Sequence, residues 1–347
     1  MKTKKIPVIV VAAILLTASM ATAIASVTFR DVLELPSAAS RYAATSLLIG
    51  VAMAGMRIVG VGQHGHIVYS DDQGKKWLQA SVPVSSDLVA VQFPTPQKGW
   101  AVGHDGVVLH SSDGGATWVK QFDGRVAARL MESVYAGSAA ADEIQKNSSQ
   151  EADKPFMDVC FENETTGFIV GAFSLIFRTT DGGKNWSPWY DRIDNPRRFH
   201  LYAIRSIGQD IYITAEQGTV FKLDRQAGRF TAIKTPYAGS YFGITGTSGA
   251  LVAFGMRGNA YRSRDNGSNW QKVETGVPVG LVGATMTGEG KLVLVSQGGH
   301  ILVSSDNGAS FVPIKMDHPV PAAAVVALGT ETVAMVGPLG AKVQSIK

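Results

Sequence analysis

Short hydrophobic runs separated by glycine-rich turns fill most of the chain. In one representative segment, the runs cover residues 88–93, 100–103, 107–111 and 118–121. They are rich in β-branched and aromatic residues, and polar positions alternate with apolar ones. Because alternation with a period of two is typical of half-buried strands, this segment predicts four short antiparallel β-strands.

An octet with the pattern Ser/Thr-x-Asp-x-Gly-x-x-Trp/Phe recurs between the third and fourth strands. Clear copies occupy residues 70–77, 111–118, 179–186, 263–270 and 304–311, and a decayed copy occupies 223–230. Glycine permits the positive φ of a tight hairpin, and a short carboxylate accepts backbone N–H groups across the turn. We therefore expect a structural role for the octet aspartates, which are Asp72, Asp113, Asp181, Asp265 and Asp306.

A second kind of glycine-rich turn extends the repeat count to seven. These turns cover residues 62–65, 103–106, 171–174, 216–218, 255–258, 296–299 and 337–340. Four strands in a period of about 40 residues are typical of a propeller blade. The sequence therefore predicts an all-β, seven-bladed β-propeller. Residues 29–36 resemble a fourth strand, so we expect this N-terminal strand to close the last blade.

One unit contains an insertion at residues 123–152, between blades two and three. Apolar residues at positions 126, 127, 130, 131 and 134 have helical spacing, which predicts a helix over 125–135. The small and polar stretch that follows, 137–153, is predicted to be flexible. Two interpretations of the helix stay open, because it could dock a partner or pack on the rim of the propeller.

The first 25 residues are typical of a secretory signal peptide. Lys2, Lys4 and Lys5 precede an apolar run at 6–16, and small residues follow at the predicted cleavage site. An uncleaved membrane anchor is the alternative, although the run is short for a bilayer span of about 20 residues. We expect the propeller to cover residues 26–347 and to be exported to a periplasm or lumen, free or associated with the membrane.

Charge and cysteine content narrow the function further. The chain carries 32 basic and 28 acidic side chains, for a net charge of +4, and the signal region contributes three of the lysines. We therefore expect no nucleic-acid binding. Cys160 is the one cysteine, so it has no intramolecular disulfide partner, and its apolar neighbours predict a buried thiol.

The two faces of the predicted propeller carry different loops. The octet hairpins share one face, whereas the glycine-rich turns and the blade linkers share the other. On this second face we expect partner binding by His64, His104, Phe173, Arg192, Arg197, Arg198, Arg257, Tyr237 and Tyr241. Aromatic and arginine side chains dominate interaction hot spots, while an ordinary solvated turn is the alternative for each residue. The histidines lack metal-ligand spacing, so we expect no metal and no cofactor.

An enzymatic role is weighed against sialidases, which also contain this octet. The N-terminal Phe-Arg-Ile-Pro motif of sialidases is absent, because Phe29 and Arg30 are followed by Asp31 and Val32. Glycoside hydrolysis needs a placed pair of carboxyl groups. The sequence offers no obvious pair, and the clear octets use five aspartates in their turns. We expect no enzymatic activity. A carbohydrate- or ligand-binding propeller and a sialidase-like glycosidase are the alternatives.

The mature chain resembles the photosystem II stability/assembly factor family of Asp-box propellers. The resemblance rests on the octets, on residues 99–103 (GWAVG) and 167–171 (GFIVG), and on 173–179 (FSLIFRT). It implies an exported seven-bladed propeller that assembles a membrane complex without catalysis. It also implies an arginine patch, for which Arg192, Arg197, Arg198 and Arg257 are loose analogues.

The expected partner is an integral membrane protein or an intermediate of its assembly, and the expected state is a monomer. Similar sequences also occur in non-photosynthetic bacteria, where the resemblance implies service to another membrane system. In such a host, we expect an accessory protein of a transporter.

Overall fold

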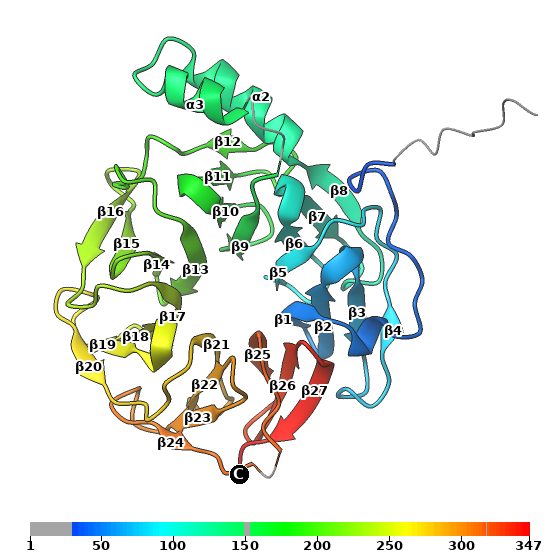
Figure 1. Cartoon of the computed structure of the whole chain (residues 1–347), viewed down its shortest axis with the longest axis vertical. Helices are drawn as coiled ribbons and strands as arrows, with labels where there is room; N and C mark the ends of the chain where they lie inside the picture. Colours follow the sequence, from blue (N-terminus) through cyan, green and yellow to red (C-terminus); the bar gives the residue numbers. More distant parts are fainter. Residues whose placement is uncertain (1–29, 149–152, 317) are drawn as a thin grey trace, which may run out of the picture. The chain divides into compact units, whose positions relative to one another are not determined.

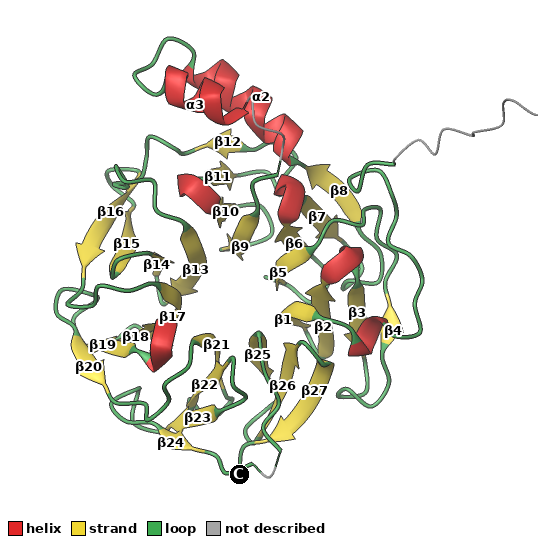
Figure 2. Ribbon diagram, viewed as in Figure 1, coloured by secondary structure: helices red, strands yellow, loops and turns green. Residues whose placement is uncertain are grey.

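The computed structural model describes residues 30–148, 153–316 and 318–347. Residues 32–347 form one compact unit, in which seven sheets stand around a common centre (Figures 1 and 2). The prediction of an all-β, seven-bladed propeller is confirmed. The predicted signal peptide, residues 1–25, lies outside the described residues.

Consecutive strands pair in antiparallel order in every blade. The first two blades contain β1 (Leu48–Ala54), β2 (Arg57–Gly62), β3 (Ile67–Ser70) and β4 (Leu78–Gln79), then β5 (Leu88–Gln92), β6 (Gly99–Gly103), β7 (Val108–Ser111) and β8 (Val119–Phe122). The third and fourth contain β9 (Phe156–Phe161), β10 (Gly167–Gly171), β11 (Ile176–Thr179) and β12 (Ser187–Pro188), then β13 (Leu201–Ile207), β14 (Asp210–Ala215), β15 (Thr219–Asp224) and β16 (Arg229–Lys234).

The fifth and sixth blades contain β17 (Tyr241–Thr247), β18 (Ala250–Gly255), β19 (Ala260–Ser263) and β20 (Gln271–Val273), then β21 (Leu281–Met286), β22 (Leu292–Ser296), β23 (Ile301–Ser304) and β24 (Val312–Pro313). The seventh contains β25 (Ala324–Ala327), β26 (Thr332–Gly337) and β27 (Gly340–Ser345). In each blade the first of these strands lies nearest the centre (Figure 1).

The core lies between neighbouring blades, where their sheets face one another. All residues of β6, β10, β18 and β22 are buried, because each of these second strands is covered on both faces. Between blades two and three, the Trp100 ring stacks on Phe161 with centroids 3.6 Å apart. Such stacking lets each blade bury faces that it could not bury alone.

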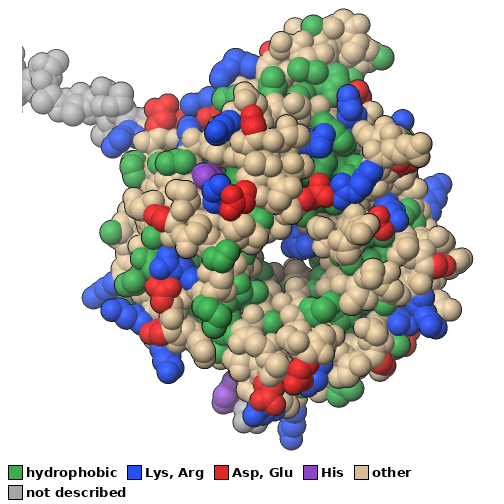
Figure 3. Space-filling model, turned by 180° about the vertical axis from the view of Figure 1, so that it is seen from behind, with side chains coloured by type: hydrophobic (Ala, Val, Ile, Leu, Met, Phe, Trp, Pro, Cys, Tyr) green, Lys and Arg blue, Asp and Glu red, His purple; other side chains and the backbone are tan. Residues whose placement is uncertain are grey.

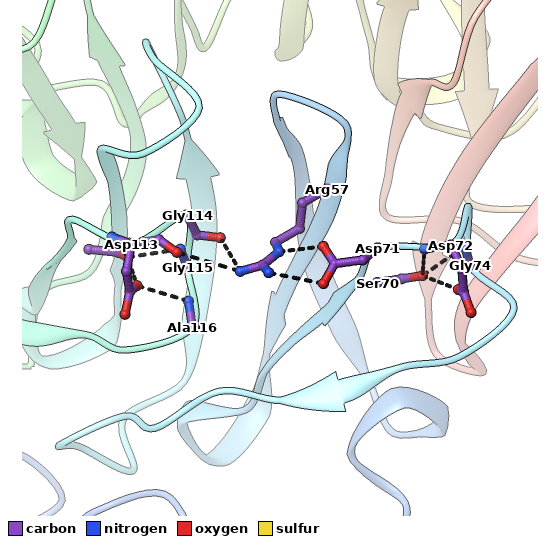
Figure 4. A network of polar contacts seen from close by, with 10 residues as sticks. Arg57, Ser70, Asp71, Asp72, Gly74, Asp113, Gly114, Gly115 and Ala116 are labelled. Carbon is purple, nitrogen blue, oxygen red and sulfur yellow. Dashed lines mark hydrogen bonds and ion pairs between the residues drawn. The ribbon is translucent and has the colours of Figure 1, made fainter.

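The octet hairpins agree with the turn role predicted for their aspartates (Figure 4). In the first copy, the Ser70 hydroxyl donates to Asp72 (2.9 Å) and accepts the N–H of Gly74 (2.8 Å). Asp72 also accepts the N–H of Lys76 (2.8 Å), and the Trp77 indole donates to the Gly74 carbonyl (3.1 Å). The four other clear copies repeat the contacts between hydroxyl, carboxylate and backbone.

An arginine joins the first two octets across the blade boundary (Figure 4). Arg57 donates to both carboxylate oxygens of Asp71 (2.7 and 2.9 Å) and to the Gly114 carbonyl of the next hairpin (3.2 Å). The polar groups of this face are therefore largely used by the fold itself.

The N-terminal segment does not form the predicted closing strand. Residues 30–36 contain no strand, and the seventh sheet has three strands among the described residues. Instead, Leu33 is buried in the cluster of Val82 and Val84, and the Ser85 N–H donates to the Val32 carbonyl (2.8 Å). The prediction was wrong because these apolar residues bury themselves against the linker between blades one and two. Blade seven packs directly on blade one, where Val336 and Ala341 contact Leu48 and Val68.

Candidate functional site

The turn face consists of the turns between second and third strands, the blade linkers and the helical insertion. Four of its turns are single 3₁₀ turns, η2 (Gln63–Gly65), η3 (His104–Gly106), η4 (Ala172–Ser174) and η5 (Met256–Gly258). In each, the N–H after the turn donates to the carbonyl of the first turn residue, at 3.0 to 3.2 Å. The turns thus have one backbone geometry.

The tips of these turns have different side chains on that shared backbone. His64, Asp105, Phe173 and Arg257 have φ angles of 55°, 57°, 52° and 55°. This left-handed conformation is uncommon for residues other than glycine. The same backbone therefore presents an imidazole, a carboxylate, a phenyl ring and a guanidinium on one face.

Phe173 departs most from what the turn requires. Its side chain is 50% exposed, and Ser174 after it also has a positive φ (65°), at a position where the three other turns have glycine. Two consecutive left-handed residues without glycine are strained, and strain of this kind concentrates at functional sites. A neighbouring linker supports the tip, because the Phe173 N–H donates to His200 Nδ1 (2.9 Å).

An aromatic row leads from this tip towards the centre of the propeller. It consists of Phe173, His200, Tyr202 and Phe242, whose successive ring centroids lie 4.6, 6.3 and 5.6 Å apart with nearly perpendicular planes. Tyr202 and Phe242 line the central cavity. Neither was among the predicted site residues. The signal for Tyr202 was its place beside the buried Leu201 on a first strand, where alternation turns it towards the cavity.

Besides Phe173, five of the predicted site residues are exposed. His64 and His104 are exposed on the turns of blades one and two, and Arg257 is exposed on blade five. Arg192 and Arg197 are exposed on the linker after β12, and Arg197 donates to Gln217 (2.8 Å).

The two predicted tyrosines are less accessible. Tyr237 is partly buried and stacks on Tyr261 with centroids 5.5 Å apart. Tyr241 is fully buried, with its hydroxyl bonded to Thr235 (2.8 Å), so we leave it out of the candidate surface.

The insertion forms two helices on the outer rim of blade three (Figure 2). Helix α2 (Gly124–Tyr135) begins at Asp123, whose carboxylate accepts two N–H groups of the first turn. Its Met131 and Tyr135 are buried against Trp186 and Tyr190. The structure therefore shows packing on the rim, and a docking role for the outer surface stays a prediction. Within the residues that the structure describes, no helix is long and apolar enough to cross a bilayer.

A second helix, α3 (Ala141–Ser148), lies where a flexible stretch was predicted. That prediction was wrong over these residues, because Ile144 is buried and Glu143 is fixed by two partners. The Tyr190 hydroxyl donates to Glu143 (2.8 Å), and Arg198 forms an ion pair with it (3.0 Å).

Arg198 therefore has a structural contact that the sequence did not reveal. Its guanidinium lies 3.9 Å from the centre of the Tyr190 ring and donates to both oxygens of Glu143. The bond from Arg198 holds the pKa of Glu143 below its ordinary value. We assign Arg198 to holding the insertion, and its predicted partner contact is not needed to explain it.

Metal and thiol chemistry have little support on either face. Among the described residues, no group of three His, Cys, Asp or Glu side chains is placed to hold a metal ion. Cys160 is buried, as its apolar neighbours predicted, and burial raises its pKa to about 12. Such a thiol is inert compared with an exposed thiolate.

Comparison with known sequences decides the family. Residues 69–135 and 138–303 match the sequence profile of the family described as Photosynthesis system II assembly factor YCF48. The chain belongs to the Ycf48 family. This confirms the resemblance drawn from the octets and from the two Gly-aromatic-x-Val-Gly segments.

Known members of the family are distant in sequence. The photosystem II assembly lipoprotein Ycf48 of Synechococcus sp. (strain CC9902) is 22% identical over 72% of this chain and 69% of that protein. The chloroplastic photosystem II stability/assembly factor HCF136 of Arabidopsis thaliana is 20% identical over 69% of this chain and 60% of that protein. Both relatives are named as photosystem II assembly proteins.

A solved structure of the family shares the fold. The structure described as YCF48 bound to D1 peptide superposes with a TM-score of 0.66, at 16% identity, over 88% of this chain and 94% of that chain. At this identity the likeness establishes the seven-bladed fold alone.

Proposed function

We propose that this chain is an exported, monomeric and non-catalytic scaffold that binds an integral membrane protein, or an intermediate of its assembly, on the turn face. Membership of the Ycf48 family supports the assembly role. A relative with the same fold has been solved with a D1 peptide bound. The signal-like residues 1–25 support export. In a host without photosystem II, the partner would belong to another membrane system, such as a transporter.

The observation that carries the proposal is the exposed tip of blade three. Phe173 places half of a phenyl side chain in solvent from a backbone conformation that favours glycine. Folding gains little from such a residue, because its exposed ring buries little apolar surface. The neighbours of the ring are His200, with centroids 4.6 Å apart, and the Lys154 ammonium, 5.9 Å from the ring centre. A half-exposed aromatic residue that costs folding free energy is typical of an interaction hot spot.

The central cavity supports a non-catalytic role. Among the described residues that line it, Asp158 is the one carboxylate. Asp158 already accepts the N–H groups of Val159 (3.0 Å) and Ile204 (2.7 Å). Retaining and inverting glycosidases both use two carboxyl groups on opposite sides of the bond. This favours a binding scaffold over the glycosidase alternative.

The test is affinity capture from detergent-solubilised envelope with two glycine variants. Phe173→Gly removes the ring and relieves the left-handed strain, so the protein should stay folded. Asn266→Gly is the matched control, because Asn266 has a similar φ (55°, against 52° for Phe173) in an octet hairpin on the opposite face. We expect wild type and Asn266→Gly to recover the same membrane protein, and Phe173→Gly to recover at least about tenfold less of it.

Two other results would count against the proposal. Equal recovery by all three proteins would move the binding surface away from the tip of blade three. If wild type recovers no membrane protein, the carbohydrate-binding alternative is favoured. A glycan-binding screen would then test it.

A further inference from the structure

The inner strands enclose a central cavity of about 470 Å³, lined by residues from all seven blades. The space-filling view from behind shows the hole at the centre of the propeller (Figure 3). Its described lining is mainly Val, Ala, Ile and Gly, and the two charged residues among them are Asp158 and Arg205. A buried carboxylate paired with an arginine in this lining needs a physical explanation.

Asp158 occupies a position at which the six other blades have glycine or alanine. It pairs with Val170, the last-but-one residue of its second strand. At the same register position, the six other blades have Gly50, Ala90, Ala203, Gly243, Gly283 and Ala324. Small residues suit this position because neighbouring inner strands come close. A Cβ added to Gly50, for example, would lie 2.8 Å from the Val89 carbonyl oxygen.

The fold therefore does not need a carboxylate at position 158. Asp158 is only 4% exposed, and burying a carboxylate is costly unless it is paired and hydrogen-bonded. Here it accepts two backbone N–H groups and forms an ion pair with Nη1 of Arg205, on the adjacent blade. Positions where a chain departs from its own repeat are expected to be functional. We therefore assign to Asp158 the role of holding the Arg205 guanidinium in place.

Arg205 has donors to spare. Nη1 is held by Asp158 and by the Ile204 carbonyl (2.7 Å), while the side chain is 50% exposed. Within the described part of the chain, its Nε and Nη2 atoms make no hydrogen bond. A guanidinium fixed at one nitrogen is pre-organised, and its free edge suits a carboxylate in bidentate geometry.

We propose that the central cavity binds a carboxylate on an apolar body, with the carboxylate on the free edge of Arg205 and the apolar body against the valine and alanine walls. The cavity volume falls within the range of about 300–1,000 Å³ that is usual for small-ligand sites. The ligand is a free short-chain acid or the carboxyl terminus of a polypeptide. This site does not rest on the membrane-protein partner of the turn face.

Isothermal titration calorimetry of the purified full-length chain tests the site with two pairs of probes. Hexanoate is compared with hexanamide, and acetyl-Ala-Val-Ala with its C-terminal amide. The variant Asp158→Ala/Arg205→Val reproduces the residues Ala324 and Val326 that blade seven has at the same positions. It should fold, because blade seven already has each of these residues at the corresponding position of its first strand.

We expect at least one carboxylate to bind wild type, with at least about tenfold weaker binding of its amide and of the double variant, since hydrogen bonds to charged groups are the strong ones. Tighter binding of hexanoate identifies a free acid as the ligand, and tighter binding of the peptide identifies a chain terminus. Binding of neither carboxylate, or equal binding by the double variant with its circular dichroism unchanged, would overturn the proposal. Loss of membrane-protein capture by Phe173→Gly would leave this result untouched.

Discussion

The octet face and the turn face of this propeller are both built from hairpins, but they use their residues in opposite ways. On the octet face, the same Ser/Thr, Asp and Gly recur and make the same hydrogen bonds in five blades. On the turn face, four turns share one backbone geometry while their tips differ in chemistry. The side chains that repeat on the octet face stabilise the hairpins. The turns on the other face keep their backbone geometry without a fixed tip side chain, so their tips can vary to bind a partner.

The difference predicts contrasting energetics for aromatic residues on the two faces. Trp118 is 4% exposed and donates from its indole to the Gly115 carbonyl, whereas Phe173 is 50% exposed. We expect Trp118→Ala to lower the free energy of unfolding by about 3–5 kcal/mol. Phe173→Ala should change it by no more than about 0.5 kcal/mol. Urea unfolding followed by circular dichroism measures both, and similar losses would erase the contrast.

A smaller effect is expected at the arginine that holds the insertion. Arg198→Ala removes the ion pair to Glu143 and the contact with the Tyr190 ring. We expect a loss of about 1–2 kcal/mol, together with faster amide hydrogen exchange in α3. Arg197→Ala is the matched control, since this neighbouring arginine is exposed, donates to Gln217 and lies 5.0 Å from the centre of the Phe199 ring, but has no contact with α3 among the described residues. Equal exchange in the two variants would return Arg198 to the candidate partner surface.

The octet face should also be more sensitive to acid. Hydrogen bonds lower the pKa of every clear octet aspartate, and those from Asn269 and Ser263 lower the pKa of Asp265 to about 2. Because the folded pKa lies below the ordinary value, these bonds stabilise the protein above about pH 4. Their contribution is lost as the pH falls from about 4 towards 2. A melting temperature that stays flat across this interval would show that the octet carboxylates do not stabilise the fold.

The smallest predicted effect concerns the backbone at the tip of blade three. Phe173→Gly should be more stable than Phe173→Ala by about 1 kcal/mol, because only alanine retains the steric cost of a left-handed φ. This is the reverse of the usual order in regular structure. Thermal unfolding of the two variants measures the difference, and a more stable alanine variant would show that Phe173 is not strained.

Periodic features could be predicted from the sequence, whereas single departures from them could not. The strands of blade two and the octet hairpins follow from alternation and turn chemistry, which are local. Residues 30–36 could pack on the edge of blade seven or on the linker between blades one and two. In the structure, Leu33 is buried against that linker. No local sequence pattern predicts which of the two surfaces the segment packs against.

Some residues of the candidate site could also be predicted from the sequence, and others could not. Phe173 and Arg257 were predictable because a glycine-rich turn marks a surface position. The role of Arg198 was not, since its partner Glu143 lies 55 residues away, in a helix that composition made look flexible. The pair of Asp158 and Arg205 becomes visible only when all seven inner strands are placed in one register.

Site-specific photo-crosslinking in intact envelopes tests the central claim most directly. A benzoyl-phenylalanine is placed at position 173 on the turn face or at position 266 on the octet face, two exposed positions with nearly the same φ. We predict that position 173 crosslinks to an integral membrane protein and that position 266 does not. Crosslinking from position 266 alone would contradict this prediction, because it would place the partner on the octet face, whose polar groups stabilise the hairpins.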